Sequence, residues 1–215
     1  MEKHKFYSQK INNQGFTIIE LLIATVVFSS ILLIATIGII YISKTYVEGQ
    51  VVIKNQDNTQ AILQNLSSAI KFDDNSNHNI VLPMLNIASH NYFFCVGNYE
   101  YIYSLNQLFN DRSTSVGLSQ LPNNNSPICS YPTVLTGARQ LLSQNERIGE
   151  LNITSSSNIY DITLNIAYGN DSVLQTLGST ASPPSYQYRC TISAFSISLC
   201  AVSSLSTIVT PRIGA

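Results

Sequence analysis

The fold of this chain is decided by one stretch, from Gly15 to Ile42, which reads GFTIIELLIATVVFSSILLIATIGIIYI. A single acid, Glu20, is followed by about 22 residues without a charge, and as a helix at ~1.5 Å per residue they span roughly 33 Å. This length is enough to cross a hydrocarbon core of ~30 Å. A core helix of a soluble protein usually has one polar face, and this run has none. The sequence therefore predicts a membrane-associated helix.

Glu20 is the unusual residue of this helix. A charge at the centre of a spanning helix costs ~2.5–3.5 kcal/mol on translocon scales, so an acid here is a functional candidate. Its natural partner is a positive charge at membrane depth, and the helix has none before Lys44. Cleavage after Gly15 would create a free amine on Phe16, and the amine of a neighbouring, axially displaced copy could meet Glu20. This geometry predicts assembly.

The short cationic leader, the residues Gly15 to Glu20 (GFTIIE) and the apolar run after them resemble the prepilin family, which includes type IV pilins and pseudopilins. The resemblance implies cleavage between Gly15 and Phe16 by a prepilin peptidase, N-methylation of Phe16, and packing of the helix into a filament core. The implied partners are other pilin subunits, an inner-membrane assembly platform, and membrane lipid before assembly.

Two features favour a minor pilin or pseudopilin over a major pilin. Major pilins often carry a proline midway along the apolar segment, whereas this chain has Gly38 and no proline between Ala35 and Ile40. The part after the spanning helix, roughly 170 residues, is one domain by size and larger than the head of many major pilins. A major pilin is one alternative, and a membrane-anchored surface binding protein that never polymerises is another.

The charges before the helix predict its orientation. The leader contains three lysines and one acid, and positive charge beside a spanning helix keeps that end in the cytoplasm. The globular part is then expected outside the cytoplasmic membrane, and later on the pilus or cell surface. The expected organisation is a cleaved leader (1–15), a transmembrane or filament-core helix (16–43), an amphipathic extension of that helix (44–74) and a β-rich head (75–215).

The fold class expected is α+β: a pilin-like, long N-terminal helix packed on a C-terminal antiparallel sheet. Helical spacing of Val47 with Val51, and of Ile62 with Leu66, extends the first helix as far as Phe72. Two helices with a bend near Gly49 are the alternative. The helix is expected to stop at residues 73–79, which are rich in Asp and Asn.

After this point the periodicity is that of strands. The clearest strand is Tyr160–Tyr168, in which Asp161, Thr163 and Asn165 alternate with larger side chains, so that one face is buried and the other is wet. A turn at Ser155–Asn158 precedes this strand. Loops are predicted at Leu118–Pro132 and Gly178–Ser185. The other strands are predicted at Tyr92–Val96 and Tyr99–Leu105 (a hairpin around Gly97-Asn98), Arg139–Ser143, Ile148–Thr154, Tyr186–Ile192 and Ile197–Val209.

All four cysteines lie in the exported part: Cys95, Cys129, Cys190 and Cys200. An even number in an oxidising compartment suggests two disulfides, with three connectivities open. Neighbours in the sequence are the simplest pairs, Cys95 with Cys129 and Cys190 with Cys200. Free buried cysteines are the alternative. A zinc site is not expected, because there is no C-x-x-C pair and the histidines are distant in sequence.

Composition and motifs give no support for an enzyme, a metal or a cofactor. Asp73, Asn75 and Asn77 are spaced like calcium ligands, but His78 stands where the glycine of such a loop belongs and Met84 where its glutamate belongs. The exported part contains two histidines, His78 and His90. Neither is accompanied by a nucleophilic residue in a recognisable catalytic motif.

Charge also bears on partners. The chain of 215 residues has 11% charged residues, 45% hydrophobic residues and a formal net charge of -1. No basic run stands out, so a direct nucleic-acid surface is not expected and nucleic acid enters only indirectly, through DNA uptake. Adhesion, motility, DNA uptake and secretion all remain open.

Overall fold

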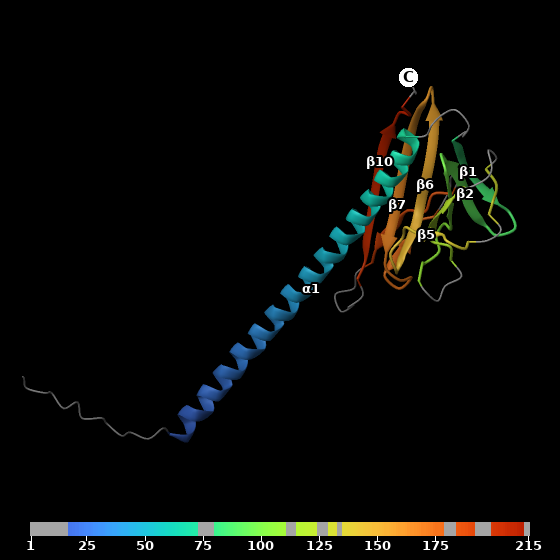
Figure 1. Cartoon of the computed structure of the whole chain (residues 1–215). Helices are drawn as coiled ribbons and strands as arrows, with labels where there is room; N and C mark the ends of the chain where they lie inside the picture. The colour runs from blue at the N-terminus through green and yellow to red at the C-terminus, as the bar shows by residue number, and fades with distance from the viewer. Residues whose placement is uncertain are drawn as a thin grey trace, which may run out of the picture. The chain divides into compact units, whose positions relative to one another are not determined.

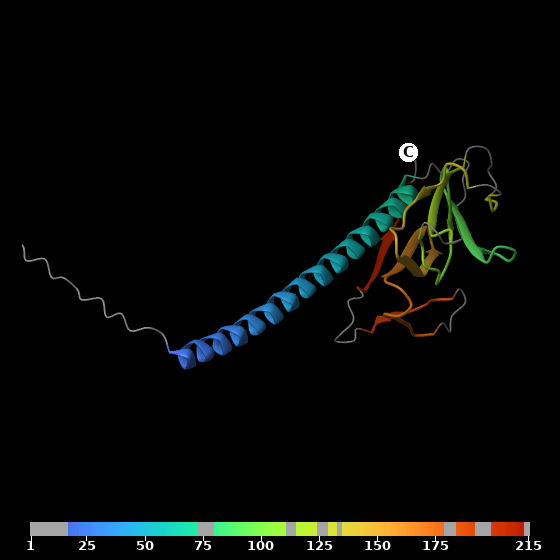
Figure 2. The same cartoon turned by 90° about the horizontal axis from the view of Figure 1, so that it is seen from below.

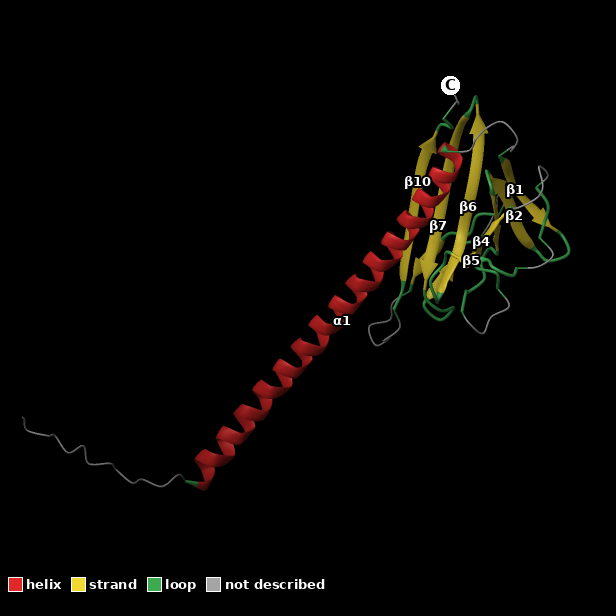
Figure 3. Ribbon diagram, viewed as in Figure 1, coloured by secondary structure: helices red, strands yellow, loops and turns green. Residues whose placement is uncertain are grey.

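The computed structural model describes residues 17–72, 80–110, 115–123, 129–132, 135–178, 184–191 and 199–212. The chain divides into two compact units, one ending at Thr45 and one beginning at Tyr46. One element, α1 (Ile18–Lys71), contributes to both. The α+β class is confirmed: one long helix is followed by antiparallel strands (Figures 1 and 3).

The helix α1 is 54 residues long and continuous through Gly49, so the single helix expected from the sequence is confirmed over the described residues and the bend is not observed. Its sequence contains no proline, and proline is the residue that most often kinks a helix. Thr17 caps its start. The helix ends at Lys71, directly before residues 73–79, which lie outside the described residues together with the calcium-like spacing of Asp73, Asn75 and Asn77.

The described strands form three antiparallel sheets. The largest has the order β1-β2-β3-β4-β5, the second has the order β10-β7-β6, and β8 pairs with β9. All strand pairings are antiparallel. The strands are β1 (Val81–Asn86), β2 (Asn91–Val96), β3 (Tyr99–Tyr103), β4 (Leu118–Pro122), β5 (Arg139–Gln140), β6 (Glu146–Ser156), β7 (Ile159–Tyr168), β8 (Leu174–Thr176), β9 (Tyr188–Cys190) and β10 (Ala201–Val209).

Two hairpins form where turn residues predicted them. Gly97 joins β2 to β3 with a φ of 56°, in the left-handed region that favours glycine. Ser157 and Asn158 join β6 to β7, and both have positive φ (50° and 62°), which is the two-residue turn whose twist matches that of paired strands.

The loop predicted at Leu118–Pro132 is wrong in its first part. Leu118–Pro122 is β4, paired with β3 on one side and β5 on the other. Pro122 suggested a loop, but it takes the last pair of the strand, opposite Tyr99, where a missing N–H is tolerated. Residues 124–128 of that stretch lie outside the described residues.

Several strand boundaries also differ from the expected ones. The strand at Arg139–Ser143 shortens to two residues. Beside it the Gln140 side-chain oxygen accepts the N–H groups of Leu118, Leu141 and Leu142, and the Leu141 N–H also donates to the Leu118 carbonyl at 2.8 Å. The strand at Tyr186–Ile192 shortens to β9, and the one at Ile197–Val209 to β10, with residues 192–198 outside the described residues. The sequence did not predict β1 or β8.

The main core lies between α1 and the two larger sheets. Ile62, Leu66 and Ile70 of α1 are fully or almost fully buried in one cluster with side chains from both sheets. Phe94 and Tyr101, neighbours on β2 and β3, stack with ring centroids 4.8 Å apart. The helix therefore closes a space between two sheets, and burial of its apolar stripe is the main attachment of α1 to the head.

The predicted wet face of β7 is covered at one end. Asn165 belongs to that face and is buried, as is Ala167, two residues further along the strand. Ala167 lies in a second apolar cluster with Val173, Leu174 and Tyr188. The β8–β9 pair supplies these contacts, on the side of the sheet away from α1 (Figure 2). A two-stranded sheet that was not predicted thus explains the difference.

The chain passes very close to Gly149 on β6. The register of the β6–β7 pairing shifts between Ile148 and Glu150, as at a β-bulge, and the Gly149 carbonyl accepts the N–H of Tyr186 at 2.9 Å. A Cβ placed on Gly149 would lie 2.4 Å from the Tyr186 carbonyl oxygen. Only glycine lets the segment leading into β9 pack against β6 here.

We therefore expect Gly149→Ala to lower the free energy of unfolding by about 1–3 kcal/mol, because the backbone carbonyl of Tyr186 must move. Urea unfolding of the full chain in detergent, followed by tyrosine fluorescence, measures the change. The matched control is Gly49→Ala, where nothing lies within 4 Å and alanine should leave stability unchanged or raise it by up to ~1 kcal/mol. An equal effect of both substitutions would contradict the packing argument.

Candidate assembly helix and its attachment to the head

The start of α1 is closed by a reciprocal pair of side chains, Thr17 and Glu20. The Thr17 N–H and hydroxyl donate to the same Glu20 carboxylate oxygen at 3.0 and 2.9 Å, and the Glu20 N–H approaches the Thr17 hydroxyl at 3.3 Å. This is the capping-box arrangement, which satisfies backbone donors that a helix start otherwise leaves unpaired. The sequence singled out Glu20 but not this cap, although T-I-I-E has the required spacing.

Gly15 and Phe16 lie outside the described residues. Cleavage between them and N-methylation of Phe16 therefore stay predictions, as does the pairing of Glu20 with the amine of a neighbouring copy. The described part of the site shows how the Glu20 carboxylate is held: its hydrogen-bonded oxygen is Oε2, and Thr17 is the residue directly after Phe16.

The apolar residues of the first unit have no partner among the described residues of the chain. Large side chains from Ile18 to Ile42 are exposed, with Ile18 at 87% and Ile34 at 72%. One helix of the described part is long and apolar enough to cross a membrane, and its apolar window has no buried residue. A surface of this kind is stable only against lipid or other apolar surfaces.

Hydroxyl side chains within this apolar segment are satisfied by the helix itself. Thr25 donates to the Leu22 carbonyl, Ser29 to the Thr25 carbonyl, and Thr36 to the Leu32 carbonyl, at 2.7–2.9 Å. A polar group without a partner in hydrocarbon costs several kcal/mol, so these bonds allow the polar residues to face lipid.

One side of the helix has a shallow apolar groove beside Glu20. Ile23, Ala24, Val27, Phe28 and Ile31 line it together with the carboxylate. Their spacing of three and four residues places them on a single face. The face that carries the acid is thus also one that a second helix could pack against.

The second half of α1 is attached to the head by side-chain amides as well as by its apolar stripe. Asn55 is buried and donates to the Ile166 carbonyl of β7 at 3.2 Å. Asn58 donates to the Glu146 carboxylate at 2.5 Å, and Asn65 accepts from the Tyr101 hydroxyl at 3.0 Å. These bonds fix the rotation and axial position of the helix, which apolar contacts alone leave less well defined. The sequence analysis missed all three asparagines.

Glu146 is a buried carboxylate where α1 meets the start of β6. Its side chain accepts the Ser143 N–H at 2.8 Å besides the Asn58 amide. Burial raises the pKa of Glu146, and the Ser143 and Asn58 hydrogen bonds and the charge of Lys54 oppose this only in part. The group resists ionisation in the folded protein.

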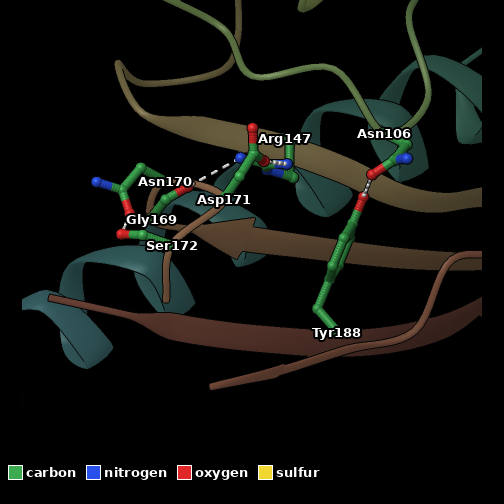
Figure 4. A network of polar contacts seen from close by, with 7 residues as sticks. All are labelled: Asn106, Arg147, Gly169, Asn170, Asp171, Ser172 and Tyr188. Atoms are coloured by element: carbon green, nitrogen blue, oxygen red, sulfur yellow. Dashed lines mark hydrogen bonds and ion pairs between the residues drawn. The ribbon is translucent and has the colours of Figure 1, made fainter. Parts of the chain in front are cut away.

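Arg147, the next residue, points to the other side of β6 and ties down the turn after β7 (Figure 4). The Arg147 side chain is 4% exposed; its guanidinium pairs with Asp171 at 2.6 Å and donates to the Gly169 carbonyl at 3.1 Å. It also lies over the Tyr188 ring, whose hydroxyl donates to Asn106 at 2.7 Å. This network joins β9 and the segment after β3 to β6, and it is structural.

The structure contains two disulfides, Cys95–Cys129 and Cys190–Cys200. These are the pairs of sequence neighbours. The first joins β2 to the segment after β4, where Tyr131 packs edge-on against Phe93. The second joins β9 to the residue directly before β10. Loops of this size are expected to contribute about 2–4 kcal/mol each to stability.

The described residues contain no group of three or more metal-ligating side chains. His90 is exposed on the turn between β1 and β2, and its backbone N–H donates to the Asn86 carbonyl. His78 lies outside the described residues.

Comparison with known proteins identifies the N-terminal part. A family model described as the prokaryotic N-terminal methylation motif matches residues 10–36. The match supports the similarity to type IV prepilins and pseudopilins that the sequence predicted for this region. The match covers the end of the leader, the expected cleavage site, Glu20 and most of the apolar run. Neither the curated proteins nor the solved structures gave a match.

The buried Glu146 predicts a pH dependence of stability. Because its folded-state pKa is above the ordinary value of 4.5, the folded protein holds a proton that the unfolded chain has lost. Its contribution to stability is therefore full below pH ~4.5 and falls as pH rises through the folded-state pKa, by up to about 1.4 kcal/mol per pH unit. Glu146→Gln, which keeps an oxygen acceptor, should flatten this fall and equal or exceed the wild-type free energy of unfolding at pH 7.

Urea unfolding at several pH values from about 4 to 8 measures this dependence, because that range begins near the ordinary pKa of the carboxyl and extends above it. The control is Asp161→Asn, an exposed carboxylate on β7. A wild-type profile that Glu146→Gln leaves unchanged would show that the carboxylate ionises freely in the fold.

Proposed function

We propose that this protein is a minor pilin or pseudopilin, a structural subunit of a type IV pilus-like filament. The methylation motif over residues 10–36 carries the proposal. It is supported by the uncovered apolar surface of residues 17–45, which needs lipid before assembly and other helices afterwards. The matched family is one of structural subunits, and no feature of the described head suggests catalysis.

In this proposal the leader (1–15) is cytoplasmic and is removed by a prepilin peptidase. Residues 16–43 then form the transmembrane and filament-core helix, residues 44–74 its amphipathic extension, and residues 75–215 the head outside the membrane. An inner-membrane platform transfers the subunit from the bilayer to the filament. The minor role rests on the size of the head and on Gly38 where major pilins often have proline.

Glu20 has two successive partners in the proposed assembly. In the single chain, Thr17 donates to its Oε2 atom. In the filament, the carboxylate receives the amine of Phe16 from an axially displaced neighbour, while the groove from Ile23 to Ile31 packs against a neighbouring helix. A charge pair in a medium of low dielectric constant is much stronger than in water, so it selects the axial offset between subunits.

Maturation is tested at the N-terminus. We expect mass spectrometry of the protein from membrane and filament fractions to find a chain beginning with N-methylated Phe16. Gly15→Leu should retain the leader and accumulate in the membrane, whereas Gly38→Leu, equally apolar and outside the cleavage site, should be processed as wild type. Wild-type protein that keeps its leader in every fraction would overturn the proposal.

Assembly is tested separately from cleavage. Glu20→Ala should be processed normally but be reduced at least about tenfold in sheared filaments, because the neighbour's amine then lacks its partner. Ser30→Ala, in the same helix, is the control and should assemble as wild type, since its hydroxyl bonds to the Val27 carbonyl of its own helix. Normal incorporation of Glu20→Ala would favour the membrane-anchored binding protein that does not polymerise.

A further inference from the structure

β10 is an edge strand with an unusual lack of protection. It is the outer member of the β10-β7-β6 sheet, and its nine residues pair with β7 in one unbroken register. Edge strands are usually blunted by charge, proline, a bulge or shortness. From Cys200 to Thr210 there is no charge and no proline. Within the described part of the chain, no backbone hydrogen bond reaches its outer edge from Ser203 to Val209.

A shallow groove runs beside this strand. Gln60, Gln64 and Ser67 of α1 line one wall, and Leu205, Ser206 and Thr207 of β10 line the other. The walls are mostly uncharged and polar, so an added strand would meet hydrogen-bonding side chains from α1 without repulsion of like charges.

The sequence of β10 is nearly symmetrical about Leu205. Reading outward from the centre of AVSSLSTIV, Ser204 corresponds to Ser206, Ser203 to Thr207, and Val202 to Ile208. If two copies pair antiparallel with Leu205 opposite Leu205, each hydroxyl meets a hydroxyl, Val202 meets Ile208, and Ala201 meets Val209. Such cross-strand pairs stabilise a sheet, and a self-complementary patch is what a two-fold contact requires.

In this pairing, residues that meet also lie on the same face of the sheet. The register with β7 places Ser203, Leu205 and Thr207 on the core side. Val202, Ser204, Ser206 and Ile208 are on the outer side, where Ile208 is 71% exposed. In the paired arrangement Ile208 gains contact with Val202 of the second copy.

We propose that β10 is a self-association edge, through which two copies of this chain join their three-stranded sheets into one continuous six-stranded sheet. The contact does not rest on the proposed function, because it involves the head alone. One strand pair buries less than the ~1,200 Å² of a stable complex, so the contact between two single molecules is weak.

The part of α1 that packs on the head has a defined direction relative to β10. Asn55 bonds to Ile166, which is opposite Ser203, and the Lys71 carbonyl accepts the Arg212 N–H, so that this part of α1 runs parallel to β10. In an antiparallel pair the two α1 segments run in opposite directions. The N-terminal ends of these two α1 segments therefore lie at opposite ends of the joined sheet.

Cysteine pairing tests the register directly. In full-length protein in detergent, a Ser204→Cys chain mixed with a Ser206→Cys chain should form an intermolecular disulfide, because these positions are opposite each other. Each variant alone places its cysteines on a diagonal of about 7–8 Å, too far to bridge well. We expect at least about fivefold more linked dimer in the mixture than in either variant alone. The four native cysteines are already paired.

The matched control is a mixture of Asn152→Cys and Thr154→Cys chains, which have the same spacing on β6, at the other end of the sheet. Linked dimer in the Ser204/Ser206 mixture that does not exceed this control and the single variants would overturn the proposal.

A charge exchange provides a second, independent test. Chains with Ser204→Lys and Ser206→Lys should lose self-association, as should chains with Glu at both positions, and a mixture of the two should regain it in a pull-down with two tags. Loss of folding cannot produce regain on mixing. Failure of the mixture to associate, with both variants folded by circular dichroism, would refute β10 pairing.

Discussion

The rest of this structure depends on one constraint. The first half of α1 has an apolar surface that no other described part of the chain covers. From Ile18 to Ile42 the large side chains are exposed, and the helix therefore requires hydrocarbon or other helices around it. Every local feature described for this segment fits that requirement. Thr17 and Glu20 close its first turn, and its hydroxyls bond to their own backbone. Between Ile18 and Ile42, the Glu20 carboxylate is the group that can form a specific pair with a positive charge of another chain.

The second half of the same helix attaches it to the head. Its apolar stripe closes the space between two sheets, and Asn55, Asn58 and Asn65 bond to β7, β6 and β3. Apolar burial provides most of the free energy, while the amides define one rotation and one axial position. A single continuous helix thus has an apolar surface in its first half and a surface that packs on the head in its second half. The helix passes from one to the other without a proline or a break.

The sequence predicted what depends on local pattern. The apolar run and the helical spacing after it indicated α1, and Gly97-Asn98 and Ser157-Asn158 indicated their hairpins. Prediction failed where contacts between segments distant in the sequence determine the local structure. Pro122 suggested a loop because its neighbours across the sheet were unknown, and Asn165 looked solvent-exposed because the small β8–β9 sheet that covers it has only three-residue strands. In the candidate site, Glu20 was evident as an acid in an apolar run. Glu146 and its asparagine partner are 88 residues apart, and no periodicity connects them.

The parallel course of α1 and β10 has a mechanical consequence. A pull on the helix from its N-terminal side enters the head through the asparagine contacts and the apolar stripe, and through them it acts along the strands of the β10-β7-β6 sheet. A load in that direction is in shear, so the bonds of the nine-residue β10–β7 ladder share it and do not open one after another. The disulfide from β9 to Cys200 holds the start of β10 covalently as well. A head built in this way resists a pull directed along β10 and the part of α1 that packs beside it.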